Sequence, residues 1–440
     1  MNLPKNGKSV LDLLNKNGFE SYAVGGFVRD MLMGKTLGDF DITTSALPDE
    51  TENILRQNNI KYIETGLKHG TITAVFDGEQ IEITTFRVDG EYKDNRRPET
   101  VSFVRDIKED LSRRDFTVNA MAYNEKNGVV DLFGGQQDIE DKIIRCVGDA
   151  DTRFKEDALR IMRALRFSAV LGFAIEEKTK EAIFNNKERL LNVAPERIFT
   201  ELYKMLKGDN IYNVLNEYQQ VIAVIIPELE PAMHCEQNNP WHIYNVFQHI
   251  IHAVKSAPPD SDVRLVMLLH DIGKPAVKTT DSSGKDHFKF HAKKSAEIAE
   301  KVLRRFHASN KIINKVTQLV FYHQSVENVD DIRVKRWLAK IGAEQTENLF
   351  KVRMADLLAH NPEKIDYEYH KLEELLKELN KIVEADEAFS VKDLAVHGND
   401  LIALGFKGKE IGEKLNEILM LVIDDKLKND KQEILSYLID

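Results

Sequence analysis

The pattern of apolar residues changes once along this 440-residue chain, near position 150, and this change limits the folds open to it. Between residues 20 and 145, short β-prone runs alternate with turns and short helical stretches. These runs are SYAVGG (21–26), GDFDITT (38–44), GTITAVF (70–76), QIEITTF (80–86) and NGVVDLF (127–133). After residue 150, apolar residues recur at helical spacing and β-branched runs disappear. We therefore predict an α/β head followed by an all-α body.

Composition excludes several classes of protein. The net charge is −11, with 61 Lys and Arg against 72 Asp and Glu, which excludes a strongly basic chain that coats nucleic acid. Cys146 and Cys235 are far apart, so neither a disulfide framework nor a Cys-based zinc site is predicted. The first residues are too polar for a signal peptide, and no apolar run approaches the ~18 residues of a membrane span. We expect a cytoplasmic protein without a membrane partner.

Two carboxylates stand out in GDFDITT. In a strand, residues i and i+2 point to the same face, so Asp39 and Asp41 would lie side by side with Phe40 on the other face. Such a pair suits Mg²⁺, which takes one or two carboxylates together with substrate phosphates. In QIEITTF, Glu82 could supply a third carboxylate. A surface turn with two acids is the plainer interpretation of the spacing alone.

The residues before Asp39 and Asp41 favour a phosphate-binding site over a plain surface turn. Gly25 and Gly26 precede a helix-like segment that carries Arg29 and Asp30, and a helix N-terminus attracts phosphate. This GGxxRD followed by DxD resembles the nucleotidyltransferase superfamily related to DNA polymerase β, in the version of the class II tRNA nucleotidyltransferases and poly(A) polymerases. Further stretches resemble that family: DGEYKDNRRPETVSF (89–103), LSRRDFTVNAMAY (111–123), VDLFGGQQDI (130–139), EDALRIMRALRF (156–167) and ERIFTELYKML (196–206).

The resemblance implies a set of site residues. Asp39 and Asp41 would be catalytic and hold Mg²⁺. Nucleotide would bind at Gly26, Arg29, Arg114, Asp115, Asn119, Asp157, Arg160 and Arg163, with Arg114 on the triphosphate and Asp115 on a ribose hydroxyl. The 89–103 segment, with Asp94, Arg96 and Arg97, looks like the family's flexible loop. Family members restricted to adding C lack much of that loop, so its presence implies competence to add A.

Asp157 and Arg160 also suggest how a base could be selected. Three apart on a helix, they would be neighbours on one face. A carboxylate can accept from the amino group shared by cytosine and adenine while a guanidinium donates to the adjacent ring acceptor. The resemblance implies that the pair replaces a nucleic-acid template. The alternative for Asp157 and Arg160 is an ordinary ion pair on a helix. For Arg197 and Glu201 there are also two alternatives, a stabilising ion pair and a catalytic role.

A second constellation lies in the helical body. The adjacent His270 and Asp271 sit in an apolar helical run, where burying them is costly unless something satisfies them. Imidazole with carboxylate suits a divalent transition metal. The set resembles the HD phosphohydrolase superfamily, which implies a second divalent metal held by His249, His270, Asp271, His291, His323 and Asp356. Lys274 would contact a substrate phosphate or lie solvated at a helix end.

Together these features predict four parts: a nucleotidyltransferase head (1–150), a helical neck that selects nucleotide and binds RNA (151–230), an HD domain (231–362) and a helical tail (363–440). The expected function is addition of C, C and A from CTP and ATP to the tRNA 3′ end. Two alternatives share the head motifs: an enzyme that adds only A, and poly(A) polymerase. Another is of a different class, an HD phosphohydrolase whose head only binds RNA.

Overall fold

The computed structural model describes residues 3–35, 38–90, 101–324, 331–384 and 389–439. The chain divides into two compact units, Met1–Asn210 and Ile211–Asp440, which are described separately. Most of the 89–103 segment, including Asp94, Arg96 and Arg97, lies outside the described residues.

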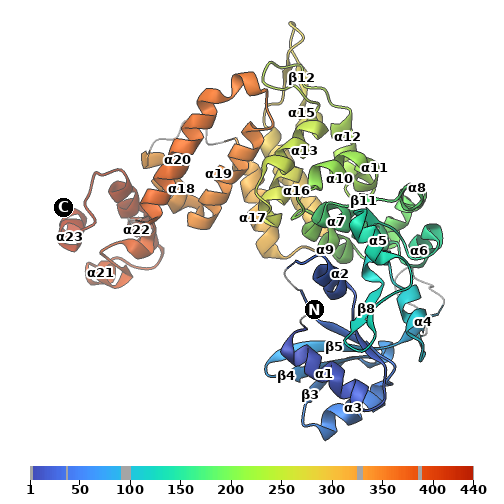
Figure 1. Ribbon diagram of the computed structural model, residues 1–440. Coiled ribbons are helices and arrows are strands. Elements are labelled where there is room, and N and C mark those ends of the chain that lie inside the picture. The colour runs from blue at the N-terminus through green and yellow to red at the C-terminus, as the bar shows by residue number, and fades with distance from the viewer. Residues whose placement is uncertain (1–2, 36–37, 91–100, 325–330, 385–388, 440) are drawn as a thin grey trace. The chain divides into compact units, whose positions relative to one another are not determined.

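The N-terminal unit is built on a mixed sheet of seven strands in the order β3-β4-β5-β2-β1-β8-β9 (Figure 1). Within it β2 and β5 are parallel, and the other neighbouring pairs are antiparallel. The strands of this sheet are β1 (Ser21–Val24), β2 (Asp41–Thr44), β3 (Lys61–Gly66), β4 (Thr71–Phe76), β5 (Glu79–Thr85), β8 (Met121–Asn124) and β9 (Gly128–Asp131). Two smaller pairs are β6 (Arg87–Asp89) with β7 (Val101–Phe103), and β10 (Ile143–Ile144) with β11 (Ala174–Ile175).

Side chains from the helices and from the sheet together form the hydrophobic core of the N-terminal unit. Val10, Leu11 and Leu14 of α1 join Ile42, Ile72 and Ile83 of the sheet in one cluster of buried residues, which fits the alternation along these strands. The helices of the sheet region are α1 (Lys5–Lys16), α2 (Gly26–Leu32), α3 (Pro48–Gln57), α4 (Ile107–Ser112) and α5 (Gly135–Glu140). The helices that complete the unit are α6 (Ala150–Glu156), α7 (Leu159–Leu171), α8 (Glu177–Asn186) and α9 (Pro195–Met205).

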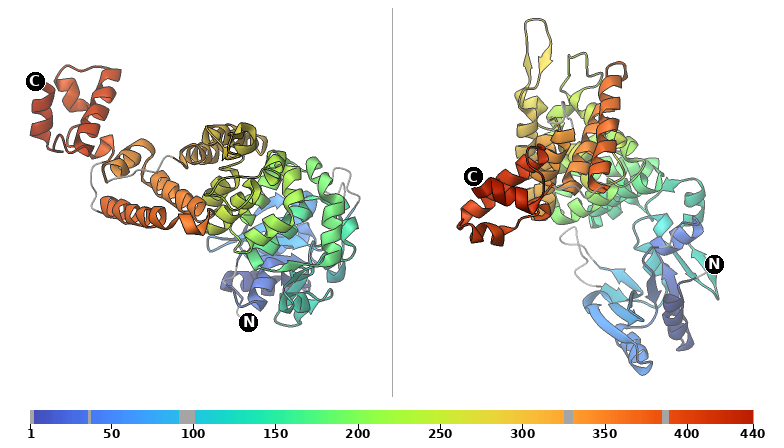
Figure 2. Two further views of the ribbon diagram at one scale, coloured as in Figure 1. Left: turned by 90° about the horizontal axis from the view of Figure 1, so that it is seen from above. Right: turned by 90° about the vertical axis from the view of Figure 1, so that its left-hand side faces the viewer.

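The C-terminal unit is almost entirely helical. A short hairpin of β12 (Thr279–Thr280) and β13 (Asp286–His287) projects from it (Figure 2). Its first helices are α10 (Ile211–Glu217), α11 (Gln219–Ile225), α12 (Glu230–Met233), α13 (Val246–Ser256), α14 (Ser261–Leu269) and α15 (Lys274–Val277). The remaining helices are α16 (His291–Arg305), α17 (Asn310–Tyr322), α18 (Asp331–Ile341), α19 (Ala343–Leu357), α20 (Asp366–Glu384), α21 (Gly398–Ala403), α22 (Lys409–Ile423) and α23 (Lys431–Ile439).

The predicted fold class, an α/β head followed by a helical body, is confirmed. Each of the five predicted strand segments contains a strand, but β2 begins only at Asp41, so Asp39 precedes the strand instead of lying in it. The body also contains short strands that its helical pattern did not predict, such as β11 and β12. The four-part division stays a prediction. Among the described residues, no helix is both long and apolar enough to cross a membrane.

Candidate functional sites

Asp41 starts β2 at the point where the sheet offers a group of carboxylates. Its partner across the parallel ladder is Glu82 of β5. Burial is the main reason that the pKa of Asp41 rises to about 6, and the charges of Glu82 and Asp39 raise it further, although Arg114 opposes the shift. Asp39 is exposed, and Phe40 between the two packs edge-on against Phe27 at 4.7 Å. Glu82 and Asp39 thus lie near enough to Asp41 to act on its charge, and a cation bound there would relieve the repulsion.

Arg114 is held beside this group by a buried carboxylate. Asp110 of α4 is fully buried and accepts hydrogen bonds from Arg113 (2.8 Å), Arg114 (3.1 Å) and the Thr43 hydroxyl (3.2 Å). Burial alone would raise the pKa of Asp110, but the guanidinium groups of Arg114 and Arg113 lower it, so the carboxylate is charged. An Arg114 Nη1 atom lies 3.4 Å from the position that a Cβ on Gly25 would take. The Arg114 guanidinium therefore lies against the glycine turn that precedes α2.

Four of the predicted nucleotide-binding residues form one chain of contacts, in which Arg163 is partly exposed and the other three residues are buried. Arg29 donates to Asn119 at 2.5 Å, Asn119 donates to Asp115 at 3.3 Å, and Arg163 donates to Asp115 at 2.7 Å. Gly26 is the first residue of α2, the helix that carries Arg29. Despite burial, the guanidinium of Arg163 lowers the pKa of Asp115. The structure thus brings residues from α2, the 111–123 stretch and α7 into one charged network.

The expectation that Asp157 and Arg160 lie three apart on one helix is wrong. Asp157 ends α6 with an extended backbone, so the two residues do not share one continuous helix. Its carboxylate instead accepts from the backbone N–H of Leu159 (3.0 Å) and from Arg197 (3.1 Å). Arg160 pairs with Glu156 at 2.6 Å.

Arg197 and Glu201 do not form the i,i+4 ion pair that was one of the two alternatives for them. Arg197 reaches across to Asp157, while Glu201 pairs with Arg166 at 2.5 Å and lies 3.8 Å from Arg163. One nitrogen of Arg197, Nη1, is buried without a hydrogen-bond partner. The sequence identified both residues but not their partners.

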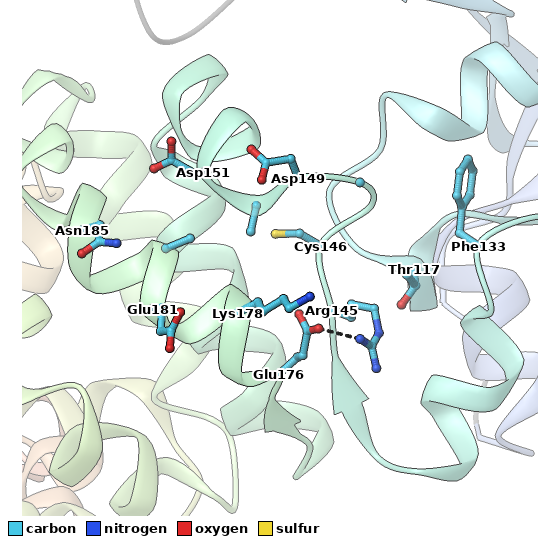
Figure 3. Close-up of a pocket in the computed structure, with 13 residues that line it drawn as sticks. Thr117, Phe133, Arg145, Cys146, Asp149, Asp151, Glu176, Lys178, Glu181 and Asn185 are labelled. Carbon is cyan, nitrogen blue, oxygen red and sulfur yellow. Dashed lines mark hydrogen bonds and ion pairs between the residues drawn. The ribbon is translucent and has the colours of Figure 1, made fainter.

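The N-terminal unit also has a cavity of about 630 Å³ that contains none of the predicted site residues (Figure 3). Figure 3 shows Arg145 paired with Glu176 on its wall. Four carboxylates and two cations line it: Asp149, Asp151, Glu176 and Glu181 against Arg145 and Lys178. This balance of charge disfavours a triphosphate in the cavity.

In the C-terminal unit, the structure brings together the six residues of the predicted HD site, here called the HD cluster: His249, His270, Asp271, His291, His323 and Asp356. They come from α13, the end of α14, α16, the end of α17 and α19, and all are buried. Asp271 lies between two groups: its Oδ2 is 3.3 Å from the Nε2 atoms of His249 and His270, and its Oδ1 is 3.1 Å from Nε2 of His291.

The imidazoles of the HD cluster are oriented for a metal. In each of the four histidines, Nδ1 lies 2.6 to 3.1 Å from a backbone carbonyl oxygen: Ala359, Met267, Phe288 and Val320 for His249, His270, His291 and His323 respectively. Because a carbonyl can only accept, each Nδ1 must carry the proton. The Nε2 atoms then face inward, which is the arrangement of metal-ligating histidines.

The buried carboxylates of the HD cluster also favour binding of a cation. Both oxygens of Asp271 are buried and accept no hydrogen bond, although Lys274 Nζ lies 2.6 Å away. Burial opposes charge on His270, but Asp271 and Asp356 raise its pKa to about 10. Lys274 is only 4% exposed, so the solvated alternative for this residue is wrong. The residues present therefore fit a divalent metal.

Two histidines were missed by the sequence interpretation. His360 lies with His249 and Asp356 in a further group of potential metal ligands, and its ring is 4.6 Å from that of His242. Burial lowers the pKa of His360 to about 4 and that of His242 to about 2. A possible signal for His360 was its i,i+4 spacing from Asp356, which places both on one side of a helix end.

Comparison with known proteins identifies three segments. Residues 21–145 match the poly A polymerase head domain, residues 172–233 match the "Probable RNA and SrmB- binding site of polymerase A", and residues 286–438 match the tRNA nucleotidyltransferase domain 2. The third match begins inside the predicted HD domain and ends in the predicted tail, so it does not separate the two.

Relatives extend the likeness to the full chain. A CCA-adding enzyme of Staphylococcus aureus is 35% identical over 98% of this chain and 96% of its own. One of Geobacillus thermodenitrificans is 52% identical, but that alignment spans 45% of this chain and about half (48%) of the relative. The crystal structure of the Bacillus stearothermophilus CCA-adding enzyme in complex with CTP matches with a TM-score of 0.73 at 27% identity, covering 100% of this chain and 98% of that one.

Proposed function

The chain belongs to the family of CCA-adding enzymes, and from this we propose that it adds C, C and A, taken from CTP and ATP, to the 3′ end of tRNA without a nucleic-acid template. The observation that carries the proposal is the position of Asp41 opposite Glu82 at the start of β2, with Asp39 and Arg114 near enough to act on its charge. In support, the related Bacillus stearothermophilus enzyme was crystallised with CTP.

Asp39 and Asp41 would hold Mg²⁺, with Glu82 as a further oxygen ligand. When bound, such metal ions activate the attacking 3′ hydroxyl and stabilise charge on the phosphates. Arg114, kept in place by Asp110, would bind the triphosphate. Its guanidinium offers several donors in a fixed plane, which suits phosphate oxygens.

The network of Arg29, Asn119, Asp115 and Arg163 would bind and orient the nucleotide. Asp115 is charged and could accept from a ribose hydroxyl. Base selection would use Asp157 and Arg160 from neighbouring but separate positions, because Arg197 and not Arg160 holds Asp157. The carboxylate then needs only a cytosine or adenine amino group to fill its remaining acceptor positions.

We also propose that the chain acts in the cytoplasm. Both cysteines are buried and unbonded, which suits a reducing compartment.

Incorporation of labelled CTP and ATP into tRNA transcripts tests the proposal. Addition of C, C and A followed by a stop supports it. Addition of A only to a transcript that already ends in CC would indicate an A-adding enzyme, and long A tails would indicate a poly(A) polymerase. Absence of incorporation would favour a phosphohydrolase with an RNA-binding head.

A second activity is favoured by the HD cluster, whose four inward-facing Nε2 atoms surround Asp271. We propose that the cluster holds a divalent transition metal and hydrolyses phosphate esters, such as 2′,3′-cyclic phosphates at damaged tRNA ends. The metal would supply an activated water. Hydrolysis that depends on added metal, and that is lost in His270→Ala while nucleotide addition continues, would support this second activity.

A further inference from the structure

Phe167 of α7 lies among three arginines of the N-terminal unit. The guanidinium carbon (Cζ) of Arg166 is 4.0 Å from the centre of the Phe167 ring. Those of Arg29 and Arg163 are 5.2 and 5.3 Å from it. A cation within about 6 Å of the centre of an aromatic ring is attracted to the face of that ring. Because Arg29 belongs to α2 and Arg163 to α7, one ring lies beside cations from both helices.

The surroundings of this ring exclude most water. Phe167 is 6% exposed, and its ring meets that of the fully buried Phe116 edge-on at 5.8 Å between ring centroids. Burial lowers the pKa of Arg166, so its guanidinium is also poorly hydrated. A cation–π interaction is worth more at such a desolvated place than at an exposed one. The Phe167 ring can therefore influence how the arginines around it are oriented.

Each of these arginines also has a carboxylate partner. The ion pairs are Arg29 with Asp30 (2.8 Å), Arg163 with Asp115 (2.6 Å) and Arg166 with Glu201 (2.5 Å). Three positive charges around one ring repel one another, and the negative face of the ring offsets part of that repulsion. The carboxylates and the ring together keep three guanidinium groups close to one another.

Phe167 reaches the nucleotide network through its neighbours. At 6% exposure, its ring offers little surface to a ligand. Arg29 and Arg163, however, are the two ends of the chain of contacts that runs through Asn119 and Asp115. A ring beside both ends limits the directions in which their guanidinium groups can turn.

We propose that Phe167 is a positioning residue for nucleotide addition, whose ring holds Arg29 and Arg163 in the orientation that binds the incoming CTP or ATP. The inference rests on the proposed nucleotide addition. Because two arginines of the nucleotide network depend on the ring, its loss should weaken binding of the nucleotide and leave binding of the tRNA unchanged. A KM that changes for the nucleotide and not for the tRNA is the expected result.

Substitutions in the full-length protein give the first test. Phe167→Leu keeps an apolar side chain but removes the aromatic face, and it should raise KM for CTP and ATP about tenfold, with KM for tRNA within about twofold. Phe167→Tyr keeps the ring and should restore KM for both nucleotides. Phe173→Leu is the matched control for lost packing, because Phe173 is a buried phenylalanine of the same unit and no cation lies over its ring among the described residues. It should leave KM for CTP and ATP unchanged.

Fluorinated phenylalanines at position 167 separate the cation–π interaction from packing, and they remain informative if Phe167→Leu does not fold. Each fluorine withdraws electron density from the ring face and weakens its attraction for a cation, while the shape of the ring changes little. KM for CTP should therefore rise stepwise with the number of fluorine atoms, and the midpoint of thermal unfolding should change little. The same series at Phe173 should leave KM unchanged.

The outcomes distinguish failure of the inference from failure of the function. If the unmodified protein adds C, C and A, but KM for CTP does not follow the number of fluorine atoms at Phe167, the positioning role alone is overturned. An equal rise in KM for the series at Phe173 also overturns it, because packing would then explain the effect. If the unmodified protein adds no nucleotide, the proposed function fails and the positioning role fails with it.

Discussion

Asp41 lies directly opposite Glu82 across the parallel ladder of β2 and β5. Glu82→Gln keeps the size of the side chain but removes one of the charges that raise the pKa of Asp41. We expect about a 10- to 100-fold slower nucleotide addition at limiting Mg²⁺, with part of the loss recovered at high Mg²⁺. Rates measured over a Mg²⁺ titration check this. Glu64→Gln, an exposed position on β3, should leave the titration unchanged. Equal Mg²⁺ dependence in both variants would exclude Glu82 from the metal site.

Asp110→Asn should destabilise the N-terminal unit and release Arg114. The carboxylate is buried between two arginines, and its loss should lower the free energy of unfolding by roughly 1–3 kcal/mol at pH 7. Since its pKa is lowered in the folded state, the stabilisation is complete above the unfolded pKa of about 3.9 and is lost as pH falls through the folded pKa. Unfolding by urea gives the free energy of unfolding of the unmodified protein and of Asp110→Asn. The difference between the two proteins should therefore be smaller near pH 3 than at pH 7. Glu109→Gln, exposed on the same helix, is the control.

Asp157→Ala should relax the choice of nucleotide. A carboxylate that recognises the shared amino group is worth about 1–3 kcal/mol of discrimination, so the preference for CTP and ATP over UTP and GTP should fall about 10- to 100-fold. Arg197→Ala should relax the preference less, because it only loosens the Asp157 carboxylate. Competition assays with all four nucleotides measure this, with Glu181→Ala as an exposed control. Unchanged rejection of UTP and GTP would refute the role of Asp157.

His270→Ala should reduce the bound transition metal without stopping nucleotide addition. The residue is fully buried and its Nε2 faces Asp271, so the variant loses one ligand at the centre of the HD cluster. Metal content by elemental analysis after dialysis gives the readout, and retained CCA addition shows that the N-terminal unit is folded. His370→Ala, 74% exposed at its side chain, should keep its metal. Equal metal content in both variants would contradict the HD assignment.

Two glycine substitutions should act in opposite directions. A Cβ on Gly208 would lie 2.3 Å from the Ala169 backbone, which cannot move aside easily. Gly208→Ala should therefore cost about 1–3 kcal/mol of unfolding free energy. Gly412 lies within α22 and has open space around it, so Gly412→Ala should stabilise by about 0.5–1 kcal/mol. Thermal unfolding of the two variants compares them, and an unchanged stability of Gly208→Ala would contradict the close approach of residue 208 to the backbone of Ala169.

Spacing along the sequence could name candidate residues, because motifs such as DxD and HD are local. It could not predict the partner of each charged group. Asp157 and Arg160 are three apart, but a helix end separates them and Asp157 instead meets Arg197, 40 residues later. Pairing of this kind depends on how α7 packs against α9.

In the HD cluster too, the sequence could not predict the contacts of each side chain. Its six residues could be listed in order from the sequence, whereas the inward direction of four Nε2 atoms depends on carbonyls that only the folded helices place beside Nδ1. His242 and His360 were missed for the same reason. Each lies outside a helix or strand, and only tertiary packing brings their rings together.

The most direct test of the central claim is the product ladder on a tRNA transcript that ends at the discriminator base, with labelled CTP, ATP and Mg²⁺, for the unmodified protein and for Asp41→Asn. We predict that the unmodified protein extends the transcript by three nucleotides, C, C and A, and stops. The folded Asp41→Asn variant should extend it at least a hundredfold more slowly, because a metal ligand is lost. Equal ladders from both proteins, or no extension by the unmodified protein, would contradict the account.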